Sequence, residues 1–282
     1  MKAALRWALL LSIFAVLLFP CYLMIANSFS PARGFLRNPP RFLPYAWTVD
    51  NYVAALTTRG AGMIGYDAPR PILPRWVANT AILAVVLVAG GVLINGAAGY
   101  AFGFARARWL QAVFWAFMAP IFVTRFVLLI AQVRIVTQLG LAGLTAVASM
   151  SLFWATGVFL FRNYFRAIPH EIVECARIDG AGEWRILLQV VLPMSKPMIG
   201  AAIVFLGMGA LGDYIWPLLI LTEPRTQTYL VGLMSTTLNV YAVKNIGYDL
   251  AVGTLLFLPY LALFAVSSRY FISGLTGGAL KE

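Results

Sequence analysis

Ionisable side chains are concentrated in one segment of the sequence, between Pro169 and Pro193. Six charged residues fall within fifteen positions of this charged segment: Glu171, Glu174, Arg177, Asp179, Glu183 and Arg185. Long apolar runs lie on both sides, and a group of charges this dense is costly inside lipid. We therefore expect the charged segment to face water or another protein. It is either an ordinary charged loop or an element that docks on a partner.

The charged segment is expected to form two short helices joined by a turn. Two acidic residues, Glu171 and Glu174, stand near the positive end of the first helix dipole. An Asp-Gly-Ala-Gly run then breaks the helix, and within it Gly180 can adopt a positive φ that other residues resist. The second helix, about residues 183–191, ends before Pro193.

No constellation of residues in the sequence indicates an enzyme. The phosphate-binding pattern G-x-x-x-x-G-K-[ST] does not occur, so the chain holds no ATP through a P-loop. His170 and Glu171 begin like the zinc motif H-E-x-x-H, but residue 174 is a glutamate and His170 is the only histidine. The two cysteines, Cys21 and Cys175, lie in separate segments. We therefore expect no catalytic residue, disulfide, metal site or cofactor in this chain.

A few polar residues inside apolar runs are candidates for a translocation path. Asn95 shares one helix face with three glycines at four-residue spacing, so it either lines the path or hydrogen-bonds across a helix-packing seam. Arg125 either contacts a solute from a solvated cavity or snorkels to the outer surface. Asp213 either lines the path or pairs with Arg125 or another cation. Trp216, three residues later, completes this candidate set.

The composition is that of an integral membrane protein. Of the 282 residues, 61% are apolar and 11% are charged, whereas soluble domains carry about 25% charged residues. We expect an all-α, polytopic fold with six transmembrane helices, near residues 7–26, 76–104, 110–131, 141–161, 197–221 and 250–271. The net charge of +11 is assigned to the ends of these spans, and no nucleic-acid partner is expected.

The first apolar run is expected to stay in the mature protein. It follows Lys2 and Arg6, as a signal peptide does, but it is long enough to span and no A-x-A cleavage site follows it. We therefore predict an uncleaved first transmembrane helix with its N-terminus in the cytoplasm.

The charged segment resembles the EAA motif of ABC-transporter inner-membrane permeases, which reads E-A-A, three residues, G, nine residues and I-x-L-P. Glu174, Cys175 and Ala176 stand at the first three positions, and Gly180 follows after three residues. Nine residues later comes V-V-L-P, residues 190–193. The departures, Cys for Ala and Val for Ile, are mild, and a match of this length is specific.

Three further elements resemble the carbohydrate-uptake branch of these permeases, the maltose and glycerol-phosphate type. Residues 47–52 are similar to its F-T-x-x-N-Y signature, residues 213–218 to its D-F-x-W-P-L element, and residues 269–281 to its R-Y-F-x-x-G-L-x-x-G-A-x-K ending. The resemblance is to the second permease subunit and covers nearly the whole chain. Arg125 is a departure, because these permeases usually carry apolar residues and a proline there. The loop around residues 47–52 either touches a binding protein or forms a packed lid.

The resemblance implies the type I ABC importer permease fold and a linear division of the chain. Residues 1–75 would form the first transmembrane helix and an outer loop. Residues 76–272 would form a permease core of five helices with a cytoplasmic coupling loop at 162–196, and residues 273–282 a cytoplasmic tail. The protein would be a multi-pass component of the bacterial inner or plasma membrane with both termini in the cytoplasm. Basic residues are nearly balanced between the two sides, so this orientation rests mainly on the motif.

The resemblance also implies a function and a set of partners. The chain would be a permease subunit of an ATP-driven importer for a sugar or sugar-like solute: an oligosaccharide, polyol, amino sugar or glycerol phosphate. Its partners would be a second homologous permease, two ATPase subunits that bind ATP and Mg, an extracytoplasmic or lipid-anchored solute-binding protein, and membrane lipids. An alternative from another class is a stand-alone proton-coupled solute carrier that uses Arg125 and Asp213, although no inverted repeat stands out.

The resemblance further implies that the first short helix of the charged segment would dock in a cleft of an ATPase. Glu174 would pair with a cation of the ATPase, while the small Cys175 and Ala176 would permit close approach. Gly180 would make the turn and Asp179 would cap or brace it. The full set of candidate coupling residues is Glu171, Glu174, Cys175, Ala176, Arg177, Asp179, Gly180 and Pro193.

Overall fold

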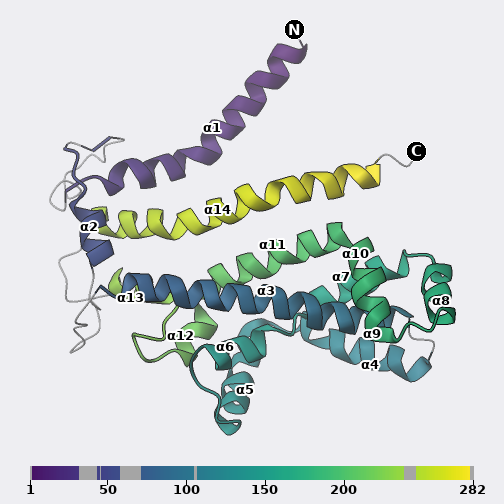
Figure 1. The fold of residues 1–282 in the computed structure, drawn as a ribbon. Helices are drawn as coiled ribbons and strands as arrows, with labels where there is room; N and C mark the ends of the chain where they lie inside the picture. Colours follow the sequence, from purple (N-terminus) through teal and green to yellow (C-terminus); the bar gives the residue numbers. More distant parts are fainter. Residues whose placement is uncertain are drawn as a thin grey trace. The chain divides into compact units, whose positions relative to one another are not determined.

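The computed structural model describes residues 2–31, 43–44, 46–57, 71–104, 107–237 and 246–279, without the side chains of residues 2–5, 236–237 and 266–279. All regular elements within these ranges are helices, which confirms the all-α prediction (Figure 1). In chain order they are α1 (Lys2–Ser28), α2 (Asp50–Thr57), α3 (Leu73–Phe104), α4 (Arg108–Met118), the 3₁₀ turn η1 (Ala119–Phe122), α5 (Arg125–Gln138), α6 (Gly143–Ser151), α7 (Ala155–Arg166), α8 (His170–Ile178), α9 (Glu183–Ile186), the π turn η2 (Leu187–Val191), α10 (Leu192–Met194), α11 (Lys196–Gly212), α12 (Ile215–Ile220), α13 (Tyr229–Thr237) and α14 (Ile246–Ala279).

The chain folds into two compact units, each built from two separate stretches. Unit 1 comprises residues 1–77 and 229–259, and unit 2 comprises residues 78–228 and 260–282. Unit 2 contains the charged segment and the helices that pack around it.

Up to six membrane spans are present in the described part of the chain, as the sequence predicted. Three helices are long and apolar enough to cross a membrane alone, at residues 6–28, 73–104 and 246–265. Three more spans arise if each of three bent helix pairs counts as one. These pairs are residues 108–122 with 125–138, bent by 111°, residues 143–151 with 155–166, bent by 45°, and residues 183–194 with 196–212, bent by 88°.

The predicted third span is not the continuous helix that its hydropathy indicated. Pro120 lies in the tight turn η1, and Val123 and Thr124 then adopt extended backbone with ψ near 130°. The helix therefore stops, and α5 starts afresh at Arg125. Arg125 is thus the first residue of a new helix, at the break of a bent pair, rather than a cation inside a continuous helix.

The predicted fifth span, residues 197–221, is also not one continuous helix. It breaks where Asp213 follows α11 with extended backbone (ψ 114°). Pro217 lies in the first turn of α12, where a missing N–H removes no helical hydrogen bond. Likewise the helical path of the charged segment continues through Pro193 instead of ending before it, because the π turn η2 precedes this proline.

The N-Y pair of the first-loop element fastens parts of unit 1 together. The buried Asn51 amide donates to the backbone carbonyls of Ser28 and Ser30, at 2.8 and 2.9 Å. The hydroxyl groups of Tyr52 and Ser28 lie 2.6 Å apart. These contacts favour the packed-lid interpretation of this element. The tail element, residues 269–281, lies outside the residues whose side chains are described.

The glycine-rich face of α3 is a packing seam within unit 2. A Cβ atom at Gly99 would lie 2.6 Å from Phe161 Cβ and 2.9 Å from the backbone nitrogen of Arg162, both on α7. A Cβ atom at Gly91 would lie 2.8 Å from Cδ1 of Leu206 on α11. Gly96, in contrast, would meet its nearest neighbour at an ordinary 3.5 Å.

We therefore predict that Gly99→Ala destabilises the protein, because backbone atoms of α7 cannot yield to the added methyl group. The expected loss is about 1–3 kcal/mol, as for other overpacked interiors. A thermal unfolding curve of the detergent-solubilised protein measures it. Gly96→Ala is the matched control and should keep or slightly raise the melting temperature, because alanine favours the helix. Equal melting temperatures for the two variants would contradict the seam.

Candidate coupling segment and cavity

The turn of the charged segment is built by its backbone around Gly180. This glycine has φ +80°, in the left-handed region that side chains disfavour. Its N–H donates to the carbonyl of Arg177, and the N–H of Ala181 donates to the carbonyl of Ala176, both at 3.0 Å. This pair of bonds is the Schellman arrangement, which satisfies the last carbonyls of a helix. The breaker predicted at this position is therefore confirmed as a fixed turn between α8 and α9.

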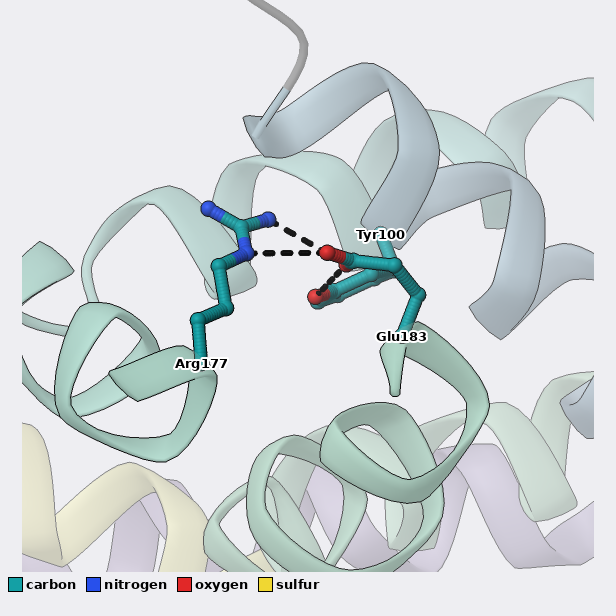
Figure 2. A network of polar contacts seen from close by, with 3 residues as sticks. All are labelled: Tyr100, Arg177 and Glu183. Atoms are coloured by element: carbon teal, nitrogen blue, oxygen red, sulfur yellow. Dashed lines mark hydrogen bonds and ion pairs between the residues drawn. The ribbon is translucent and has the colours of Figure 1, made fainter. Parts of the chain in front are cut away.

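Three side chains tie this turn to α3 (Figure 2). Arg177, in the last turn of α8, donates through Nε and Nη2 to the two carboxylate oxygens of Glu183, at 2.8 and 3.2 Å. The Tyr100 hydroxyl of α3 donates to Glu183 Oε2 at 2.5 Å. Glu183 is the first residue of α9, so one carboxylate joins three helices. This clamp joins residues far apart in the sequence and was not predicted.

The charges of the clamp reinforce one another. The hydrogen bond with Glu183 raises the pKa of Arg177 above its ordinary value. The hydrogen bond from Arg177 lowers the pKa of Glu183, and the bond from Tyr100 lowers it further. Both groups therefore remain ionised at neutral pH.

The charged segment has a buried side and an exposed side. Val173 of α8 and Ile186 of α9 are buried in a core that also contains Phe161 and Phe165 of α7. On the opposite side most candidate coupling residues are exposed, namely Glu171, Glu174, Cys175, Arg177, Asp179, Gly180 and Pro193, while Ala176 is half-buried. Two large apolar side chains, Ile178 and Trp184, are 84% and 69% exposed beside them. The segment is thus anchored in the unit while presenting an acidic and apolar surface.

Asn95 joins α3 to the break between α6 and α7. Its side chain is fully buried, and Nδ2 donates to the carbonyls of Gly91 and Leu152, at 2.6 and 3.0 Å. Its Oδ1 accepts from the backbone N–H of Trp154 at 3.0 Å. The carbonyl of Leu152 and the N–H of Trp154 belong to the helix break, where the regular ladder of hydrogen bonds is interrupted. This placement favours the seam interpretation of Asn95 over the path interpretation.

The other three candidate path residues line one cavity in unit 2. Its volume is about 440 Å³, and Arg125, Asp213 and Trp216 are in its wall. Arg125 Nη2 donates to Asp213 Oδ2 at 2.5 Å, so the two form the ion pair that the sequence allowed. Trp216 is buried, and its Nε1 donates to the carbonyl of Val147 on α6 at 3.2 Å. Asn95 is not part of this cavity wall.

One buried cation was not singled out from the sequence. Arg162 of α7 is only 7% exposed, and its guanidinium lies 4.1 Å from the centre of the Phe114 ring. It donates to Gln111 Oε1 at 2.8 Å and to the carbonyl of Phe102 at 3.3 Å. Arg162 thereby holds α3 and α4 against α7. The sequence alone suggests only a charge that ends a span.

These elements define a class of protein. An all-helical membrane core with broken spans, and a charged helix–turn–helix segment between two of them, is the permease fold of type I ABC importers. The sequence pattern of the family described as binding-protein-dependent transport system inner membrane component matches residues 87–276, and the chain belongs to this family.

Individual relatives agree with this assignment. The chain is 30% identical over 264 residues to UgpE, the permease protein of the sn-glycerol-3-phosphate transport system of Rhizobium meliloti (strain 1021), covering 92% of this chain and 91% of the relative. It is 27% identical to AraQ, the arabinooligosaccharides transport permease of Halalkalibacterium halodurans, covering 94% and 92%. The fold is similar to a chain of a bacterial ABC transporter that imports the acidic polysaccharide alginate, with TM-score 0.79, 20% identity and 96% of each chain covered. These relatives are transport permeases, and they do not support the alternative of a stand-alone proton-coupled carrier.

We predict that Glu183→Gln loosens the turn of the charged segment. The substitution removes the negative charge that Arg177 and Tyr100 share, at a cost of about 1 kcal/mol, because the exposed position screens part of the interaction. Amide hydrogen exchange of the α8–α9 turn should become roughly fivefold faster. Glu171→Gln makes the same charge change outside the clamp and should leave the exchange rate unaltered. Equal rates in both variants would show that the clamp does not hold the turn.

We also predict that Asn95→Leu lowers stability without changing solute preference. The leucine keeps the approximate size but removes the hydrogen bonds that Asn95 makes to the part-buried Leu152 carbonyl and Trp154 N–H. Each orphaned group costs roughly 1–3 kcal/mol. Thermal unfolding measures the loss, with the exposed Asn163→Leu of α7 as the control. An Asn95→Leu protein of normal stability but altered solute preference would instead place Asn95 on the path.

Proposed function

We propose that this chain is a permease subunit of an ATP-driven importer for a sugar or sugar-like solute, and that its charged segment receives motion from a separate ATPase. Membership of the binding-protein-dependent family supports the importer. Relatives named for sn-glycerol 3-phosphate and for arabinooligosaccharides support the solute class. The solute is accordingly an oligosaccharide, a polyol, an amino sugar or a glycerol phosphate.

The assembly has further components. A second homologous permease completes the membrane part, two ATPase subunits bind ATP and Mg and carry out hydrolysis, and an extracytoplasmic solute-binding protein delivers the solute. One neighbour of similar fold belongs to an alginate ABC transporter in complex with a periplasmic protein that holds an alginate pentasaccharide. The chain lies in the bacterial inner or plasma membrane, with the charged segment and both termini on the cytoplasmic side.

The observation that carries this proposal is the two-sided construction of the charged segment. The exposed side of α8 offers Glu171 and Glu174 for cations of an ATPase, and the short side chain of Cys175 permits close approach. The buried Val173 joins the segment to α7, and the Glu183 carboxylate joins it to α3. A force applied to α8 therefore reaches the spans through packed and hydrogen-bonded contacts. The two positions of the ATPases then bias two arrangements of the permease.

We predict that Glu174→Lys abolishes solute-stimulated ATP hydrolysis while the protein still inserts and assembles. The substitution places a cation where docking requires an anion, so like charges oppose the ATPase surface. Hydrolysis and uptake are measured on the assembled transporter in proteoliposomes with its binding protein. Gly180→Pro should act in the same direction, because proline fixes φ near −65° and cannot occupy the turn at φ +80°. Glu223→Lys, an identical charge change at an exposed position outside the charged segment, is the control. Normal uptake by the Glu174 and Gly180 variants would refute docking through α8.

A further inference from the structure

The cavity of unit 2 combines one ion pair with exposed aromatic rings. Its volume of about 440 Å³ falls within the range of small-molecule sites. Its wall includes Arg125 and Gln132 of α5, Phe153 and Trp154 of the α6–α7 break, Phe205 of α11, and Asp213, which follows α11. Each of these lies within unit 2, so the site does not depend on how the two units are arranged.

The ion pair makes the cavity polar while keeping its net charge at zero. Arg125 is the cation and Asp213 the anion, and the other described residues of the wall are uncharged. The Arg125 side chain is 60% exposed and the Asp213 side chain 14% exposed, so both remain accessible from the cavity. A hydroxyl group both donates and accepts hydrogen bonds, and it can use the guanidinium and the carboxylate together. A solute carboxylate or phosphate gains from Arg125 but is repelled by Asp213 at nearly the same distance.

The aromatic rings complement the apolar faces of a sugar ring. Phe153 and Phe205 are 62% and 50% exposed, and the rings of Trp154 and Phe205 lie 5.7 Å apart. Rings of this kind bury a large apolar area against a flat partner. The cavity therefore offers apolar contact on one part of its wall and paired donors and acceptors on another.

We propose that this cavity contacts the transported solute and that the Arg125–Asp213 pair selects an uncharged, polyhydroxylated compound over its acidic counterpart. The inference rests on the proposed function and narrows its solute class. It separates this chain from importers named for glycerol phosphate or for acidic alginate. Arg125 is the specificity-determining residue, and Asp213 is the residue that cancels its preference for anions.

The test uses the assembled transporter in lipid nanodiscs and two matched pairs of probes. Mannotriose is compared with trimannuronate, and galactotriose with trigalacturonate; the members of each pair differ only in carrying hydroxymethyl or carboxylate groups. Saturation-transfer NMR measures the affinity of each probe without the binding protein, whose own specificity would otherwise dominate. A neutral trisaccharide should bind the wild-type transporter more tightly than its acidic partner.

Two substitutions change the pair in opposite ways. Arg125→Leu removes the donors and leaves the carboxylate alone, so affinity for the neutral probe should fall roughly tenfold. Asp213→Asn preserves the shape but leaves a net positive charge, so the preference should shift roughly tenfold toward the acidic probe. Arg134→Leu, an exposed arginine of the same helix that is not part of the cavity wall, is the control and should change nothing.

Each outcome is decisive. The inference is overturned if the acidic probe binds the wild type as tightly as the neutral one, if Asp213→Asn leaves the preference unchanged, or if no probe binds. A separate measurement tests the proposed function. It is ATP-driven uptake in proteoliposomes supplied with the binding protein and a solute that this binding protein holds. Uptake with no effect of the Arg125 and Asp213 variants refutes only the cavity assignment, whereas absence of ATP-driven uptake in the wild type refutes the importer itself.

Discussion

The structure depends on one constraint, which is that backbone groups freed by a helix break must find partners where water is scarce. The three bent helix pairs found in the described ranges each interrupt the regular ladder of hydrogen bonds. At the break between α6 and α7, Asn95 supplies both a donor and an acceptor. Before α11, the buried Ser195 hydroxyl donates to the carbonyl of Val191 at 2.8 Å. At these two breaks, individual polar side chains therefore bond backbone groups that the interrupted helices leave free.

Three arginines of unit 2 likewise have specific acceptors. Arg162 is buried, yet a glutamine oxygen, a backbone carbonyl and an aromatic face surround its guanidinium. Arg125 is matched by Asp213 at the break that follows α11. At the charged segment Arg177 is matched by Glu183. Each of these three arginines thus has a defined acceptor, and the exposed side of α8 carries the acidic residues Glu171 and Glu174.

The sequence predicted the features that local chemistry determines. The spacing from Glu174 to Gly180 located the turn, because a positive φ favours glycine whatever the rest of the fold does. The four-residue spacing around Asn95 predicted a shared helix face, and α7 and α11 do pack against it. Hydropathy predicted the positions of the spans but not of their breaks. At the break before Arg125, Val123 is apolar and Thr124 is uncharged, so neither residue signals an interruption. The position of Arg125 at a helix start was therefore missed.

Contacts between residues that are far apart in the sequence could not be predicted, for a different reason. Tyr100 and Glu183 are 83 positions apart, and neither residue carries a local signal that names the other. Their meeting requires α3 to pass beside the start of α9, which only the packing of the whole unit fixes. The proposed coupling needs both features: the EAA-like motif marks the surface that is proposed to contact the ATPase, and the Tyr100–Glu183–Arg177 clamp ties that surface to α3. A docking motif without such a clamp would be gripped and yet transmit little.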